Sequence, residues 1–168
     1  TDDWGTQTAP LVSPDVFADV FQPVYAEIFG AVHDAGMDAW MHSCGHNLAL
    51  IPGLVEAGLD VINLLQPQLF PVPLLKGLRG RICFEMAGDM QRTLPTGDRA
   101  AIRREIGEIL DACCTDAGGL IVEKMDRMFF EAGGISPETG RFCEQEYRRL
   151  DPWRKPAARG QARPSPGK

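Results

Sequence analysis

Short apolar runs alternate with amphipathic segments along most of this chain, and glycines or prolines separate them. Four apolar runs predict buried strands, because each is only a few residues long and lies next to a glycine turn. These runs fall within residues 35–42, 57–62, 80–84 and 117–122. Three glycines, Gly36, Gly58 and Gly80, recur at intervals of 22 residues, and the first two close predicted helices. Strands that alternate with helices in this way predict an α/β protein with a parallel sheet.

The segments between the apolar runs have helical periodicity. Ser13 and Pro14 form a good helix start, and Pro23 is expected to kink or divide the helix that follows. Pro71 and Pro73 restrict the connection after the second strand to a short helix or an irregular loop. We therefore predict helices over residues 13–35, 47–57 and 99–116 and a short helix near residues 137–150.

The chain is long enough for one domain but short for a closed barrel of strands and helices. Its 168 residues, 44% of them hydrophobic, support a single core. A complete (β/α)8 barrel takes about 250 residues, so four strands fit half of such a TIM barrel or a small doubly wound sheet. We expect one domain over residues 1–150, followed by a disordered basic tail over residues 151–168.

Net charge and cysteine content restrict the partners and the cellular location that we expect for the protein. The formal charge is −6, but residues 152–168 hold five Lys and Arg residues and no acid, so the remainder carries −11. An acidic body argues against nucleic acid as a partner. No apolar run approaches the ~20 residues of a membrane span, and no signal peptide precedes the first motif, so no membrane association is expected. The five cysteines are scattered and odd in number, which favours reduced thiols and a cytoplasmic location.

The end of the first predicted strand carries the most informative motif, in which one residue separates His42 from Cys44. Residues i and i+2 of a strand point to the same side, so the two side chains can bind the same ligand. Imidazole and thiolate together suit zinc. The alternative is a buried cysteine beside a hydrogen-bonded histidine, because a structural zinc site normally has four ligands.

Every predicted strand ends in polar side chains. In a parallel α/β fold these ends share one face, where ligands bind. Asp89 can instead cap the loop that follows it, and Glu123 with Lys124 can form an ordinary solvated pair. Taken together, the polar ends indicate an active-site mouth formed by Asp2 and Asp3, His42 and Cys44, Asn63 and Gln66, Glu85, Asp89 and Gln91, and Glu123, Lys124 and Asp126.

Six segments of the chain match one family in order and spacing. They are Asp-Asp-Trp-Gly-Thr-Gln (2–7), Ser-Pro (13–14), His-Ser-Cys-Gly (42–45), Gly-Leu-Asp-Val-Ile-Asn-Leu-Leu-Gln-Pro (58–67), Gly-Asp-Met-Gln-Arg-Thr-Leu-Pro-Thr-Gly (88–97) and Gly-Gly-Leu-Ile (118–121). Across residues 1–150 the chain thereby resembles the C-terminal half of the uroporphyrinogen decarboxylase (URO-D) superfamily. The resemblance implies that the chain holds the last four strands of a (β/α)8 barrel and the loop that precedes them.

The resemblance implies one of two chemistries. True decarboxylases of the superfamily use no metal, act on tetrapyrroles and have their essential residues in the N-terminal half. Zinc-dependent methyltransferases move methyl groups between a corrinoid and a thiol, and hold zinc through His-x-Cys and a later cysteine. His42 and Cys44 match the first two ligands, and Asp126 stands at about the position of the third, with Glu123 as the alternative third ligand. A carboxylate oxygen can also bind zinc.

We therefore predict a uroporphyrinogen decarboxylase family protein whose full-length form is an enzyme. The first predicted function is that of a porphyrinogen decarboxylase-like domain, without a cofactor, acting on a tetrapyrrole or a corrinoid-linked substrate. The alternatives are a zinc-dependent corrinoid:thiol methyltransferase and a truncated, catalytically inactive remnant. Asp3, Gln66 and Asp89 are the catalytic candidates. Expected partners are a tetrapyrrole, or a methyl donor and a thiol, a corrinoid protein, and a second copy or complementary half-barrel that covers the strand edges.

Overall fold

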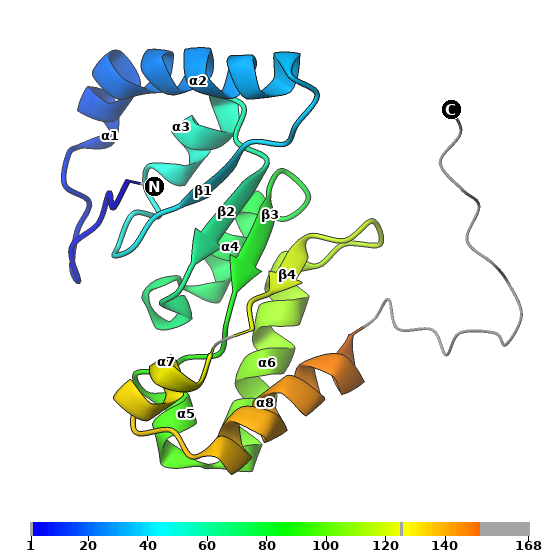
Figure 1. Cartoon of the computed structure of the whole chain (residues 1–168). Helices are drawn as coiled ribbons and strands as arrows, with labels where there is room; N and C mark the ends of the chain where they lie inside the picture. The colour runs from blue at the N-terminus through cyan, green and yellow to red at the C-terminus, as the bar shows by residue number, and fades with distance from the viewer. Residues whose placement is uncertain (1, 125, 152–168) are drawn as a thin grey trace, which may run out of the picture.

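Four parallel strands, connected by helical segments, form the centre of the molecule (Figure 1). The computed structural model describes residues 2–124 and 126–151, so the predicted basic tail lies outside the described residues apart from Asp151. The strands lie side by side in chain order, which confirms the predicted α/β class with a parallel sheet. A doubly wound sheet reverses its order at a switch point, whereas this consecutive order is compatible with half of a barrel. The strands are β1 (Trp40–His42), β2 (Val61–Leu64), β3 (Cys83–Met86) and β4 (Leu120–Val122).

Helices occur largely where the periodicity predicts them. Pro23 divides the first helical segment as expected, because a π-helical turn lies directly before the helix that contains it. The second predicted helix is shorter than expected and starts with Pro52 in its first turn. The helices are α1 (Pro14–Val16), η1 (Phe17–Phe21), α2 (Gln22–Asp34), α3 (Ile51–Glu56), η2 (Pro67–Leu69), α4 (Val72–Leu78), α5 (Thr93–Thr96), α6 (Arg99–Cys113), α7 (Arg127–Ala132) and α8 (Pro137–Leu150).

The 22-residue glycine repeat agrees with the register between β2 and β3 and differs by one residue from the register between β1 and β2. The three glycines have φ angles of 74°, 103° and 78°, as expected for residues that close helices and turns before a strand. In the observed register His42 of β1 pairs with Asn63 of β2, and Asn63 pairs with Glu85 of β3. The repeat therefore brings equivalent residues of β2 and β3 side by side, while β1 is shifted by one residue relative to it.

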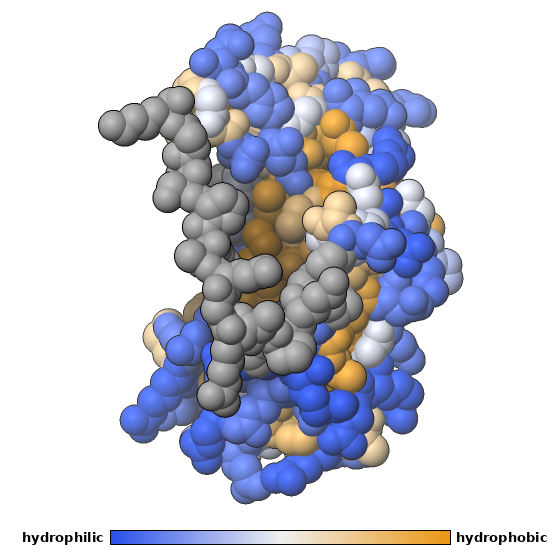
Figure 2. All heavy atoms as spheres, turned by 90° about the vertical axis from the view of Figure 1, so that its right-hand side faces the viewer, coloured by the Kyte–Doolittle hydropathy of each residue, from blue (hydrophilic) through white to orange (hydrophobic). Residues whose placement is uncertain are grey.

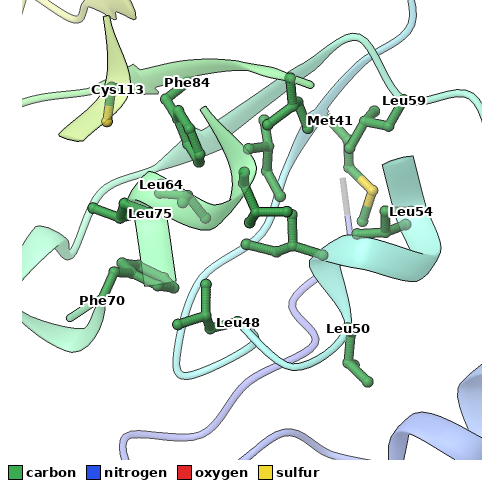
Figure 3. Close-up of a cluster of buried hydrophobic side chains, with 14 of the residues drawn as sticks. Met41, Leu48, Leu50, Leu54, Leu59, Leu64, Phe70, Leu75, Phe84 and Cys113 are labelled. Atoms are coloured by element: carbon green, nitrogen blue, oxygen red, sulfur yellow. The ribbon is translucent and has the colours of Figure 1, made fainter. Parts of the chain in front are cut away.

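Side chains of the strands alternate between two faces of the sheet. The first, here called the helix face, packs against apolar side chains of α3, α4 and α6 (Figure 3). Its members on the first three strands are 5% exposed or less, and they are Met41, Ile62, Leu64, Phe84 and Met86. Leu120 and Val122 of β4 share this face and are more exposed. The second, here called the open face, carries the alternate residues Trp40, His42, Val61, Asn63, Cys83, Glu85 and Ile121. The strands thus place the apolar core on one side and most of their polar groups on the other.

An N-terminal strap, residues 2–11, is tied to the first helices by aromatic packing. The indole of Trp4 packs edge-on against Phe17, with 5.2 Å between the ring centroids. Its Nε1–H donates to the hydroxyl oxygen of Tyr25 at 2.8 Å, and that hydroxyl donates to Asp2 Oδ2 at 2.7 Å. Burial and the hydrogen bond to Asp2 raise the pKa of Tyr25 to about 12. The strap is therefore fixed in position by Trp4.

A second apolar cluster joins α6 to α8. Ile102 and Ile106 of α6 and Tyr147 of α8 belong to it. Beside it, Arg103 donates two hydrogen bonds to Glu146, at 3.0 and 3.1 Å. None of the helices within residues 2–124 and 126–151 combines the length and the hydrophobicity that a membrane crossing requires.

Candidate functional site

The loop after β1 lies directly against the N-terminal strap, and two glycines permit the contact. Gly45 has a φ of +81°, which favours glycine, and a Cβ atom on it would lie 2.1 Å from the carbonyl oxygen of Gly5. The N–H of Gly5 donates to the carbonyl of Cys44 at 3.2 Å, and the N–H of His46 donates to the carbonyl of Thr6 at 2.6 Å. These contacts bring together segments that are far apart in the sequence.

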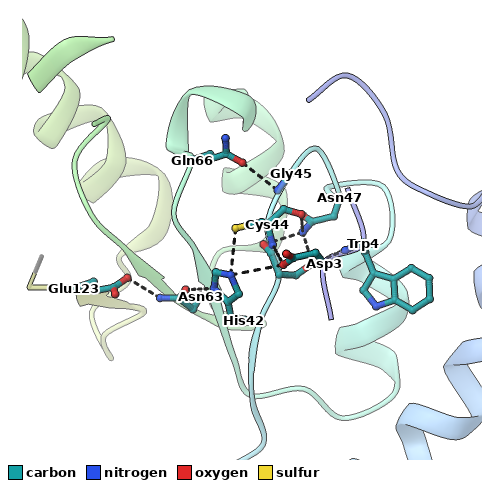
Figure 4. A network of polar contacts seen from close by, with 10 residues as sticks. Asp3, Trp4, His42, Cys44, Gly45, Asn47, Asn63, Gln66 and Glu123 are labelled. Atoms are coloured by element: carbon teal, nitrogen blue, oxygen red, sulfur yellow. Dashed lines mark hydrogen bonds and ion pairs between the residues drawn. The ribbon is translucent and has the colours of Figure 1, made fainter. Parts of the chain in front are cut away.

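Asp3 of the strap meets His42 and Cys44 at the end of β1 (Figure 4). Cys44 Sγ lies 3.2 Å from His42 Nε2, and this nitrogen lies 3.7 Å from Asp3 Oδ1. One ligand atom of each residue lies within 4.8 Å of the other two. Asp3 Oδ1 also accepts the backbone N–H of Cys44 at 2.8 Å, which holds the carboxylate beside the motif. These three residues, here called the ligand cluster, supply the sulfur, nitrogen and oxygen donors of zinc sites.

On the open face, Asn63 connects His42 to two carboxylates, of which Figure 4 shows that of Glu123. Asn63 Oδ1 lies 2.5 Å from His42 Nδ1. The amide nitrogen Nδ2 of Asn63 donates to Glu85 Oε2 at 2.7 Å and to Glu123 Oε2 at 2.8 Å. Glu85 Oε2 also accepts the indole N–H of Trp40 at 3.1 Å. This set of contacts, here called the Asn63 network, runs across the sheet from the end of β4 to β1.

Burial and a neighbouring carboxylate keep the Cys44 thiol protonated. Both raise the pKa of Cys44, burial being the larger cause and the charge of Asp3 the smaller. The thiol is therefore the neutral form at physiological pH. A bound divalent cation reverses this balance, because it stabilises the thiolate. A metal ion at this position would therefore make Cys44 an anionic ligand.

Two of the predicted catalytic candidates stabilise loops. Gln66 accepts the backbone N–H of Gly45 at 3.1 Å and so supports the loop that follows the His-x-Cys motif. Asp89 accepts the backbone N–H groups of Gln91 and Arg92 at 2.8 and 2.9 Å. This is the capping role that the sequence had left open for Asp89. Among the three candidates, Asp3 alone belongs to the ligand cluster.

The structure groups Asp3, and not Asp126, with the two ligands of the His-x-Cys motif. Asp126 caps α7, where its side chain accepts the N–H of Phe129 at 3.2 Å, a role that carboxylates often have at a helix start. Glu123, the alternative third ligand, bonds to Asn63 instead. Among the described residues the third donor therefore comes from the N-terminal strap.

A cavity of about 940 Å³ lies beside the Asn63 network, between β4, α7 and α8. Apolar side chains such as Leu120, Val122 and Phe130 line it, and so does Glu123. Figure 2, which views the molecule from the right-hand side of Figure 1, shows hydrophobic residues at the bottom of a hollow between hydrophilic parts. Glu123 therefore belongs both to the cavity wall and to the network that reaches His42.

The hydrogen bonds that connect Glu85 through Asn63 to His42 were not predicted. The sequence indicated only that Asn63 and Glu85 are polar residues at the ends of strands. The glycine repeat contains only part of the signal. It places Asn63 and Glu85 at the same register position, five residues after Gly58 and Gly80, whereas His42 lies six residues after Gly36 and its pairing with Asn63 needs a shift of one residue that the repeat does not give. Side chains at one register position and on one face are within reach of each other across neighbouring parallel strands.

The Asn63 network thus connects the ligand cluster at the end of β1 to Glu123 in the wall of the cavity beside β4. Comparisons of the chain with protein-family models, with curated proteins and with solved structures gave no match.

Proposed function

We propose that Asp3, His42 and Cys44 form a zinc site and that the protein uses it to activate a thiol for methyl transfer from a corrinoid. The observation that carries the proposal is the convergence of three different donor atoms within 4.8 Å of one another. Three protein ligands leave one position of a tetrahedral zinc ion for a substrate. This is the arrangement of the methyltransferase branch that the sequence resembles, with Asp3 in place of the later cysteine.

The donor set fits zinc better than it fits a hard cation. Magnesium and calcium are bound by oxygen ligands, whereas a thiolate and an imidazole suit zinc. The second ring nitrogen of His42 is hydrogen-bonded to Asn63, as is usual for a metal-binding histidine. Loss of the Cys44 proton on binding would supply a negative charge to the ion.

The chemistry required of the site is thiol activation. When bound, zinc lowers the pKa of a coordinated thiol and so makes it nucleophilic at neutral pH. In the transfer, the sulfur of the acceptor forms a bond to the methyl carbon, the cobalt–carbon bond of the corrinoid breaks, and cobalt keeps the electron pair. The residues of the ligand cluster hold the ion, and the Asn63 network orients one of them.

The sheet supports the same proposal. Four parallel strands in chain order are what half of a (β/α)8 barrel contains. The ligand cluster lies at the C-terminal end of β1, the end at which such barrels carry their active sites. We therefore infer that the sheet is the C-terminal half of a barrel and that a complementary half covers the outer edges of β1 and β4.

Tetrapyrrole decarboxylation receives less support from the site. A porphyrinogen carries several carboxylates, and an enzyme needs cationic side chains to anchor them. The groups that converge here include the carboxylates of Asp3, Glu85 and Glu123. Like charges at this position disfavour an anionic substrate.

Zinc stoichiometry of the purified protein tests the proposal. We expect about one equivalent in the wild type, none in Cys44→Ser, and full retention in Cys83→Ser, whose thiol lies on the open face outside the ligand cluster. Cobalt(II) in place of zinc gives a sulfur-to-metal absorption band that Cys44→Ser removes. Wild-type protein should then methylate a thiol from methylcobalamin. Absence of metal from the wild type, or retention of metal in Cys44→Ser, would refute the zinc site and make metal-free decarboxylation the next assay.

A further inference from the structure

We propose that Asn63 is a positioning residue that fixes the tautomer and orientation of His42, so that Nε2 is the nitrogen presented to the ligand cluster. The tautomer follows from hydrogen bonds alone. Its consequence for metal affinity rests on the proposed zinc site. The two parts can therefore be tested separately.

The carboxylates of the network determine the orientation of the Asn63 amide. Glu85 Oε2 and Glu123 Oε2 lie 2.7 and 2.8 Å from the same end of this amide. Ionised carboxylates only accept hydrogen bonds, so this end must be the NH₂ group, and each of its hydrogens is used by one carboxylate. The amide oxygen then faces His42.

The amide oxygen in turn determines the tautomer of the ring. An amide oxygen has no hydrogen to donate, so the contact of 2.5 Å between Asn63 Oδ1 and His42 Nδ1 requires the hydrogen on Nδ1. In the neutral ring the lone pair is then on Nε2. This atom lies 3.2 Å from Cys44 Sγ and 3.7 Å from Asp3 Oδ1. The ring therefore directs its lone pair to the point where the sulfur and the carboxylate converge.

The position of Asn63 in the sheet makes this arrangement rigid. Asn63 is 7% exposed and lies in β2, between the strands that carry His42 and Glu85. Rotating the amide by 180° would break all three of its side-chain hydrogen bonds and would place its oxygen against two carboxylates. Through Asn63, Glu85 and Glu123 thus set the state of a histidine on β1.

The tautomer can be measured on metal-free protein. Two-bond ¹H–¹⁵N NMR correlations at pH 8 distinguish a ring that carries hydrogen on Nδ1 from one that carries it on Nε2. We expect the Nδ1–H form of His42 in the wild type and its loss in Asn63→Ala. We also expect its loss in the double variant Glu85→Gln/Glu123→Gln, in which both side chains can donate and no longer fix the amide. Glu138→Gln, which removes an exposed carboxylate of α8, is the matched control and keeps the wild-type tautomer.

Zinc affinity is then measured by competition with a chelator. Partners that orient a metal ligand typically contribute 10–100-fold to affinity, so Asn63→Ala and the double variant should bind zinc about 10–100-fold more weakly, although all three ligands are intact. Circular dichroism verifies folding, and the double variant provides the test if Asn63→Ala does not fold.

The outcomes separate the two proposals. An Nε2–H tautomer in the wild type, or an unchanged tautomer in the variants, overturns the positioning role. Equal zinc affinity in wild type, Asn63→Ala and the double variant also overturns it, while the zinc site stands. If the wild type binds no zinc but the tautomer changes as expected, the zinc site fails and the role of Asn63 in orienting His42 stands.

Discussion

The helix face and the open face are built from alternate residues of the same strands, yet they have different roles. On the helix face Ile62, Phe84 and Met86 are fully buried against helices. On the open face the corresponding neighbours in sequence, such as Asn63 and Glu85, bond to other polar side chains. The difference shows that a step of one residue along a strand separates a position that stabilises the fold from one that arranges the site. Each prediction below tests how complete this separation is.

The largest effect is expected for a cavity on the helix face. Phe84→Ala should lower the free energy of unfolding by about 3–5 kcal/mol, because it removes a fully buried ring from the core. Its neighbour Cys83 is half-buried on the open face, and Cys83→Ala should cost less than about 1 kcal/mol. Urea unfolding of both variants measures the difference. Equal losses would show that the two faces are energetically alike.

The choice of third ligand gives the next largest effect. Asp3→Asn should weaken zinc binding about 100-fold, which is about 2.7 kcal/mol, because it removes an anionic ligand while it keeps an acceptor for the Cys44 N–H. Asp126→Asn should change zinc affinity less than about threefold, since asparagine still caps α7. Chelator competition on the two variants decides whether Asp3 or Asp126 is the third ligand. The opposite ranking would restore Asp126 as the ligand expected from the sequence.

Zinc affinity should also depend on pH. Burial and Asp3 raise the pKa of Cys44, so zinc must displace the thiol proton on binding. Lowering the pH therefore weakens binding, by about tenfold for each unit between pH 8 and pH 7, because one proton is released for each ion bound. Zinc titrations at several pH values give this slope. A wild-type affinity that is independent of pH would mean that Cys44 is not a ligand.

The smallest expected effects are the stability losses caused by replacing two tryptophans, one in the strap and one on the open face. Trp4→Phe removes the indole N–H that donates to Tyr25, and it should cost about 1 kcal/mol and loosen the strap that carries Asp3. Trp40→Phe removes the bond to Glu85 from a residue of the open face that is 56% exposed, and it should cost less than about 0.5 kcal/mol. Thermal unfolding of both variants compares them. A larger loss for Trp40→Phe would mean that the open face also stabilises the fold.

The sequence was sufficient to predict features that depend on local pattern. The helix expected near residues 137–150 is α8, which starts with Ser136 as its N-cap and Pro137 in its first turn. The four strands follow from short apolar runs beside glycine turns. The proximity of His42 and Cys44 follows from the two-residue period of a strand.

Features that depend on tertiary contacts were not predictable in the same way. Asp3 was expected to be catalytic, but its place beside Cys44 depends on the packing of Trp4 and on the crossing of Gly5 and Gly45. None of these contacts follows from a local period. A linear alignment likewise cannot show that a carboxylate placed near a helix start is used there as a cap, as Asp126 is.

The crossing of the strap over the loop after β1 has a consequence for protein turnover. Asp3 and Cys44 are 41 residues apart in the chain, so one ion held by both would close a long loop of the unfolded polypeptide. An ion that binds only the folded form adds stability by mass action, about 2.7 kcal/mol at a free concentration 100 times its dissociation constant. Where zinc is scarce, a larger fraction of the chains would be unfolded and open to proteolysis. The abundance of the protein in a cell would then follow the supply of the metal.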